Sequence, residues 1–144
     1  PFSTAAESPF SAESVTVLGA PIAELPAAET YLRQEECAVS GRASIMEFEW
    51  HFDDVYRLTC QDLYGGSSGS PLFFDDDNEI TAIINTTTIG GETPCNLNAP
   101  CEITATGPVF RYNTSYATPV DGIGRCFTSD GYFDLALPDC PLEG

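Results

Sequence analysis

Short runs of alternating apolar and polar residues, separated by turn residues, recur along the chain and limit its fold more than any other feature. Val15 and Val17 alternate with serine and threonine, and Phe48, Trp50 and Phe52 alternate with charged residues. A period of two is typical of strands, and a helix cannot satisfy it. Other strand candidates run from Tyr31 to Val39, Val55 to Cys60, Pro71 to Phe74, Ile80 to Thr88 and Gly107 to Tyr112. This spacing predicts an all-β chain, either an antiparallel barrel or a sandwich.

Turn residues predict where these strands end. We expect Asp53-Asp54 to turn the chain after Phe52, and the acidic run from Asp75 to Glu79 suits a hairpin loop. The one good helix signal is Thr118-Pro119, an N-cap with proline at the first helical position, so a short helix is expected from Thr118 to Gly124. Residues 1–13 are predicted to be an extended connector, and residues 126–144 a tail stapled to itself.

Charge and cysteine content exclude several classes of function. The chain has 22 Asp+Glu against 5 Lys+Arg, a formal net charge of -17, so it offers no cationic surface to nucleic acid or to anionic lipid. We therefore expect neither nucleic acid nor membrane as a partner. Six cysteines without paired C-x-x-C spacing, beside a single histidine, argue against zinc and for disulfides. No metal and no cofactor is expected, and the protein is predicted to be secreted or periplasmic.

The densest turn signal, from Gly65 to Ser70, runs directly into the apolar segment that begins at Pro71. Such a Gly/Ser run is often only a flexible surface turn. The buried strand expected after it would instead hold the turn rigid, and a rigid serine turn suits a nucleophile. The pattern Gly65-x-Ser67-x-Gly69 also fits the elbow of an α/β-hydrolase, but that elbow needs a following helix and a later histidine. Here a strand follows, and His51 lies upstream.

The motif Gly66-Ser67-Ser68-Gly69-Ser70-Pro71-Leu72 resembles the nucleophile loop of chymotrypsin-fold serine endopeptidases, most closely that of the bacterial glutamyl-endopeptidase-like branch. Val15 to Pro21 resembles the first strand of that fold's second barrel, Ile80 to Thr88 the strand lining its specificity pocket, and Gly107 to Tyr112 its last strand. The resemblance implies that residues 14–125 form an antiparallel six-stranded Greek-key barrel with a short C-terminal helix. That barrel is the C-terminal half of a chymotrypsin-like double barrel.

The resemblance also implies a role for each part of the loop. Ser68 is the expected nucleophile, and the N–H groups of Gly66 and Ser68 form the oxyanion hole. Ser67 stands where animal digestive members carry an aspartate. By the same likeness Asp62 lies on the floor of the specificity pocket, although a solvated loop aspartate fits the sequence as well. The segment Asn85-Thr86-Thr87 is expected to pair with the substrate backbone, or to be an ordinary strand.

A serine hydroxyl needs a neighbouring imidazole to accept its proton. The family carries this histidine, with its aspartate, in an N-terminal barrel, for which the residues before Ser14 are too few. His51, on the polar face with Glu47 and Glu49, is an alternative base. We expect a serine endopeptidase half that is inactive alone, whose partners are a polypeptide substrate and an N-terminal protease barrel of the same precursor or a separate chain. The alternative is a non-catalytic, secreted, disulfide-stapled β domain, either a pseudoprotease or a protein-binding module.

Two further patterns concern covalent chemistry. Six cysteines allow many pairings, of which we favour Cys37–Cys60 across strands and the local loops Cys95–Cys101 and Cys126–Cys140. Asn85-Thr-Thr and Asn113-Thr-Ser fit the acceptor pattern for N-glycosylation, which matters only in a eukaryotic secretory pathway.

Overall fold

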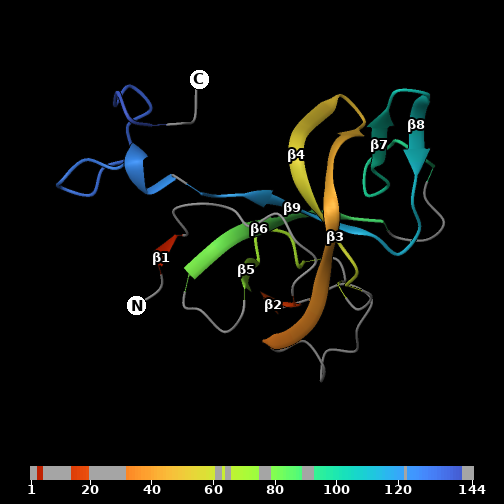
Figure 1. Cartoon of the computed structure of the whole chain (residues 1–144), viewed down its shortest axis with the longest axis horizontal. Helices are drawn as coiled ribbons and strands as arrows, with labels where there is room; N and C mark the ends of the chain where they lie inside the picture. The colour runs from red at the N-terminus through yellow and green to blue at the C-terminus, as the bar shows by residue number, and fades with distance from the viewer. Residues whose placement is uncertain are drawn as a thin grey trace.

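The computed structural model describes residues 3–4, 14–19, 32–60, 63, 66–74, 79–88, 93–121 and 123–140. The strands are β1 (Ser3–Thr4), β2 (Ser14–Gly19), β3 (Arg33–Glu47), β4 (Trp50–Leu58), β5 (Pro71–Phe74), β6 (Glu79–Thr87), β7 (Cys101–Thr104), β8 (Gly107–Phe110) and β9 (Ser115–Pro119). A 3-10 helix, η2 (Ile123–Cys126), follows them. The chain is therefore all-β, as predicted (Figure 1). Within the described ranges no helix is long and apolar enough to cross a membrane.

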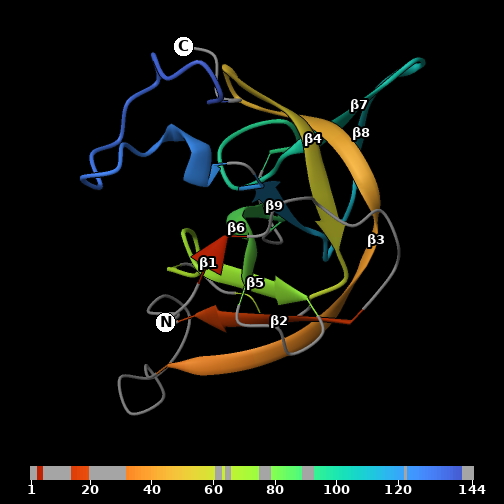
Figure 2. The same ribbon diagram turned by 60° about the vertical axis from the view of Figure 1, so that its left-hand side comes forward.

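Six of the strands form a closed ring. The order around it is β2, β3, β4, β9, β6 and β5, and β5 pairs back with β2. All the pairings in the ring are antiparallel. Figure 2 shows β2 between β5 and the start of β3. Of the predicted connector, only β1 is described, and it pairs in parallel with the beginning of β6.

Apolar side chains from all six ring strands meet in one core. Val15 and Val17 of β2 are buried while Ser14 is exposed, which confirms the alternation predicted for this strand. The other strands contribute Val39, Tyr56, Leu58, Leu72, Phe74, Ala82, Ile84 and Ala117. Since every strand of the ring supplies buried residues to the same cluster, the core fills the inside of the ring. A second, smaller cluster of Ile45, Val55 and Tyr116 lies nearer the turn of the β3–β4 hairpin.

The long β3–β4 hairpin turns earlier along the chain than the sequence predicts (Figure 1). Its turn is Phe48-Glu49, and Asp53-Asp54 lies within β4. The two aspartates face the single residue Ser44 in a β-bulge, where Asp54 adopts a φ of 55°. Arg42 holds the bulge with bonds from Nε and Nη2 to the two carboxylate oxygens of Asp54, 2.7 and 2.6 Å. Aspartate tolerates a positive φ, and the bonds from Arg42 stabilise it here. Asp53-Asp54 therefore forms a bulge within β4 and does not turn the chain.

The last strand of the ring is also not the predicted one. Gly107 to Tyr112 was expected to take this place, but β9 occupies it and pairs with both β4 and β6. β8 pairs with β7 in a separate hairpin, which attaches to β3 at Ile45 and Met46. The residues of β8 do form a strand, but a local sequence pattern does not tell a ring strand from a neighbouring hairpin.

Thr118 and Pro119 end β9 and do not begin a helix. Proline is tolerated there because it lies at the end of the strand, opposite Ala82. The short helix predicted at the C-terminal side is present only as the single turn η2, beginning at Ile123. The carbonyl of Thr81 accepts a hydrogen bond from the N–H of Val120 at 3.0 Å. This bond fixes the chain to β6 where it leaves the ring after β9.

All three favoured disulfides are present. They are Cys37–Cys60, Cys95–Cys101 and Cys126–Cys140. The first ties β3 to the chain just after β4, and the third closes the tail, which extends away from the ring (Figure 1). The disulfides are consistent with an extracellular or otherwise oxidising compartment.

The ring disulfide and the tail disulfide should differ in what they stabilise. Replacing Cys37 and Cys60 together with alanine should lower the free energy of unfolding by about 3 kcal/mol, because the bond restricts a long loop of the unfolded chain. The matched control replaces Cys126 and Cys140, between which no ring strand lies. It should leave the main transition unchanged in guanidinium unfolding followed by circular dichroism. Equal losses in the two variants would contradict a ring that is independent of the tail.

Candidate functional site

The serine loop from Gly66 to Ser70 is fastened to β6 at a single residue, Ile84. The N–H of Gly69 donates to the carbonyl of Ile84 at 2.8 Å, and the N–H of Ile84 donates to the carbonyl of Ser70 at 2.9 Å. Within the loop, Ser70 N–H donates to the carbonyl of Ser67 at 3.0 Å. These backbone bonds hold the loop against the ring immediately before β5 begins, which is unlike a loose surface turn.

Two glycines give the loop its shape. Gly66 has a φ of 95° and Gly69 a φ of 84°, both in the region that L side chains rarely adopt. A Cβ added to Gly69 would meet nothing within 4 Å. Backbone conformation, and not lack of space, therefore makes glycine the suitable residue at this position.

The three serines of the loop differ in their access to solvent. Ser68 is exposed, whereas Ser67 and Ser70 are buried, with exposed fractions of 2% and 8%. Within the described part of the chain, the N–H groups of Gly66 and Ser68 donate no backbone hydrogen bond. The predicted nucleophile is thus accessible, and the described backbone does not use the two amides predicted to form the oxyanion hole.

A hollow of about 130 Å³ lies beside the loop, between it and the paired ends of β2 and β3. Its lining consists of Val17, Gly19, Arg33, Gln34, Glu35, Leu63 and Ser67. The buried Oγ of Ser67 has no hydrogen-bond partner among the described residues. Gly19 lies close to the loop, since a Cβ there would come within 2.9 Å of the Ser70 Oγ. The end of β2 therefore supports the loop through a close approach that only glycine permits.

The segment Asn85-Thr86-Thr87 directly follows the residue that holds the loop. β5 pairs with β6 no farther along than Ile83, so among the described residues no strand covers this segment on the β5 side. Its side chains are all engaged, Asn85 with Thr118 at 3.1 Å, Thr86 with Glu47 at 3.0 Å and Thr87 with Ser115 at 2.7 Å. What the segment can offer a ligand is its backbone edge.

The remaining predicted residues do not join the loop. Asp62, Tyr64 and Gly65 lie outside the described residues. His51 lies near the tip of the β3–β4 hairpin, opposite Met46, and is exposed. No hydrogen bond joins it to Ser68. The structure therefore does not bring the alternative base to the serine.

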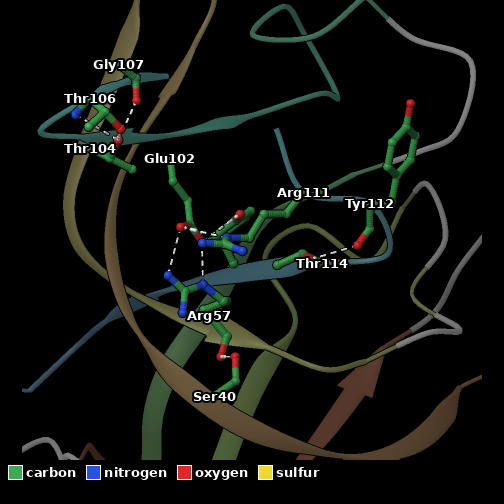
Figure 3. A network of polar contacts seen from close by, with 10 residues as sticks. Ser40, Arg57, Glu102, Thr104, Thr106, Gly107, Arg111, Tyr112 and Thr114 are labelled. Carbon is green, nitrogen blue, oxygen red and sulfur yellow. Dashed lines mark hydrogen bonds and ion pairs between the residues drawn. The ribbon is translucent and has the colours of Figure 1, made fainter. Parts of the chain in front are cut away.

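A buried ionic cluster that sequence reasoning missed surrounds Glu102 of β7 (Figure 3). The Glu102 side chain, 3% exposed, pairs with both Nε and Nη2 of Arg57, the latter at 2.8 Å. It also accepts the Nε of Arg111 at 2.8 Å and the hydroxyl of Tyr116 at 3.2 Å. Four donors occupy the carboxylate, so it anchors the β7–β8 hairpin to β4 and β9 and is a poor place for a ligand. Because 45 residues separate Arg57 from Glu102, no local pattern signals the pair.

The cluster shifts the ionisation of its members in opposite directions. Burial alone would raise the pKa of Glu102, but the hydrogen bonds from Arg57 and Arg111 lower it below the usual value. Burial raises the pKa of Tyr116, and the negative charge of Glu102 raises it further. At neutral pH the carboxylate is therefore charged and the phenol is a donor.

One group of possible metal ligands occurs among the described residues. Glu35, Cys37 and Cys60 offer ligand atoms within 4.8 Å of one another. Both sulfurs are joined in the Cys37–Cys60 disulfide, and a disulfide has no thiolate to offer a metal. The group is therefore not a metal site in this oxidised state.

Comparisons with known proteins add no assignment to this geometry. No family model, no curated protein and no solved structure matches the chain. The interpretation of the serine loop consequently rests on its own residues and contacts.

The buried hydroxyl of Ser67 should be a small cost to stability. Ser67→Ala removes an unpaired polar atom and is expected to raise the free energy of unfolding by about 1 kcal/mol. Ser129→Ala, at an exposed position in the tail, is the control and should change nothing. Chemical unfolding of both variants measures the difference. A loss of stability in Ser67→Ala would show that the hydroxyl does have a partner.

The Glu102 cluster should make folding sensitive to acid. Because the pKa of Glu102 is lowered by folding, its contribution is complete above about pH 4.5, the ordinary range of a glutamate, and is lost as the pH falls through the lowered value. Glu102→Gln should lower the free energy of unfolding by about 2 kcal/mol at pH 7 and flatten this acid dependence. Urea unfolding between neutral and acidic pH measures both effects, and the exposed Glu49→Gln is the control. An acid dependence equal to that of the wild type would contradict the role of Glu102.

Proposed function

We propose that the chain is the C-terminal half of a chymotrypsin-like serine endopeptidase of the glutamyl-endopeptidase-like branch. It supplies the nucleophile, the oxyanion hole and the specificity pocket for peptide-bond hydrolysis through an acyl-enzyme. The observation that carries the proposal is the bonding of the Gly66–Ser70 loop to Ile84 of β6, which leaves Ser68 exposed between two buried serines. Such a fixed and accessible hydroxyl is what nucleophilic catalysis by serine requires.

The order of strands in the ring supports the proposal. β2, β3 and β4 are neighbours in chain order, and β5 returns to lie on the other side of β2. This order, 4-1-2-3, is the one expected of a Greek key and supports the proposed fold. β6 and β9 then close the ring between β5 and β4. A six-stranded Greek-key barrel of this connectivity is what the resemblance of the Gly66–Leu72 motif implies.

The proposed chemistry follows from the loop. The Ser68 Oγ attacks the scissile carbonyl, and the amides of Gly66 and Ser68 donate to the oxygen as it becomes negative. Removing one such donor typically costs about 3 kcal/mol of transition-state stabilisation. The backbone edge at Asn85-Thr86-Thr87 starts next to the residue bonded to the loop, so a substrate paired with it runs past Ser68.

The proposed enzyme needs a partner segment. No histidine contacts Ser68 within the described residues, so the base and its orienting aspartate are assigned to an N-terminal barrel of the same precursor or a separate chain. The proposed substrate is a polypeptide, and the charge of -17 makes nucleic acid and anionic membranes unfavourable partners. The three disulfides favour a secreted or periplasmic setting.

A second candidate is a non-catalytic module that binds protein partners. It is favoured by exposed aromatic side chains away from the loop. These are Phe48 and Trp50 at the tip of the β3–β4 hairpin, and Phe127, Tyr132 and Phe133 in the tail. Aromatic residues are enriched in the cores of protein interfaces, so both places suit contact with another protein.

Labelling by a fluorophosphonate probe tests the enzyme proposal. The chain is incubated with the probe alone and together with the polypeptide encoded before Pro1 in its gene, and the adduct is located by peptide mass spectrometry. We expect an adduct on Ser68 only in the combined sample, because the base activates the hydroxyl. Ser68→Ala should abolish labelling, and Ser129→Ala should leave it unchanged. No adduct in the combined sample, or a preceding polypeptide without histidine, would favour the binding module.

A further inference from the structure

The two N-glycosylation patterns occupy very different places in the fold. Asn113 lies in the turn between β8 and β9, and its neighbours Arg111 and Tyr112 are exposed as it is. Asn85 lies inside β6, a strand of the ring, at a bulge between Ile84 and Thr86, which both pair with β9. The acceptor pattern is the same at both asparagines, but their surroundings in the fold differ.

The turn around Asn113 presents its side chain outward. Asn113 has a φ of 49°, a conformation that asparagine tolerates better than most residues. The Thr114 hydroxyl donates to the carbonyl of Tyr112 at 2.9 Å (Figure 3). The Thr88 N–H and hydroxyl donate to the carbonyl of Thr114 at 2.9 and 2.7 Å. The side-chain amide of Asn113 makes no hydrogen bond to a described residue, so an attached sugar displaces no hydrogen bond within the described part of the chain.

Asn85 offers no such room. Its Nδ2 donates to the Thr118 hydroxyl at 3.1 Å, and its side chain is half-buried between β6 and β9. The backbone beside it, at Ile84, is bonded to the serine loop in both directions. A sugar on this amide would crowd Thr118 of the adjacent strand β9, which the amide contacts.

We propose that Asn113, and not Asn85, carries the oligosaccharide when this chain passes through a eukaryotic secretory pathway, and that attachment precedes folding. In the transfer, the Asn113 Nδ2 forms a bond to the anomeric carbon of an oligosaccharide held on a polyprenyl diphosphate. The bond from that carbon to the phosphate oxygen breaks, the lipid diphosphate leaves with the electron pair, and the amide loses one proton.

The timing follows from the third residue of the acceptor pattern. The transferring enzyme must reach the hydroxyl of Ser115. In the folded chain Ser115 is 0% exposed, and its Oγ is 2.7 Å from the Thr87 hydroxyl. The transferring enzyme can therefore bind the acceptor pattern from Asn113 to Ser115 only before β9 joins the ring. Once attached, the glycan is compatible with the folded turn.

Secretion of the full chain from a eukaryotic host tests the proposal. Intact mass before and after treatment with an amidase that removes N-glycans should show one oligosaccharide on the wild type. Asn113→Gln and Asn113→Asp should both lose it, and the aspartate variant keeps a residue that tolerates a positive φ. Asn85→Gln is the matched control and should retain the oligosaccharide. A wild type without oligosaccharide, two oligosaccharides, or loss in Asn85→Gln alone would overturn the proposal.

A second measurement tests the timing. Purified oligosaccharyltransferase and lipid-linked oligosaccharide are added to unglycosylated full chain, either folded or reduced and unfolded in a low concentration of urea. We expect transfer to the unfolded chain only. Equal transfer to the folded chain would overturn the requirement for access to Ser115. Neither experiment depends on whether Ser68 is a nucleophile.

Discussion

The structure depends on the double pairing of β2, which holds β3 on one edge and β5 on the other. β2 contributes Val15 and Val17 to the core, and through its two pairings it turns an open sheet into a ring. An open sheet of these six strands would leave its first and last strands as full-length edges free to pair with other chains, and closure pairs those two strands with each other. Closure also encloses one core to which all six strands contribute, so the loss of any one strand would expose the others' apolar residues to water.

The same closure determines where the serine loop lies. β5 begins at Pro71, immediately after the loop, and is fixed between β2 and β6. The loop must therefore enter the ring at the end of β2, where Gly19 approaches it closely, and beside Ile84 of β6. Two positive-φ glycines and one buried unpaired hydroxyl in five residues are local costs that the surrounding pairing offsets. Local strain held by a rigid frame is common at functional sites.

Features set by local chemistry could be predicted from the sequence, and features set by distant pairing could not. The alternation at Val15 and Val17, the strand after Pro71 and the pairing of all six cysteines were predicted and are confirmed. The prediction of a turn at Asp53-Asp54 was wrong because Arg42 holds these residues in a bulge. The prediction that β8 is the last ring strand was wrong because β9, the next strand along the chain, pairs with β4 and β6. The Glu102 cluster was missed since its partners come together only through the register of separate strands. For the serine loop, the turn residues were informative, while the roles of Ser68, Gly66 and Asp62 remain predictions.

Charge places one further constraint on the proposed enzyme. Of the five arginines, Arg57 and Arg111 are paired with one buried glutamate and Arg42 with Asp54, so these cations stabilise the fold and add little field beyond it. The 22 acidic residues therefore dominate the long-range field, which attracts cationic polypeptides and slows the approach of acidic ones. Resemblance of the loop to the glutamyl-endopeptidase-like branch concerns the nucleophile and the oxyanion hole, which act on the peptide bond of any substrate. Selection of an acidic side chain would need a local cation strong enough to outweigh this field at the mouth of the site. The loop motif and the charge of the chain are thus separate properties, and both would bear on the substrate preference of the proposed enzyme.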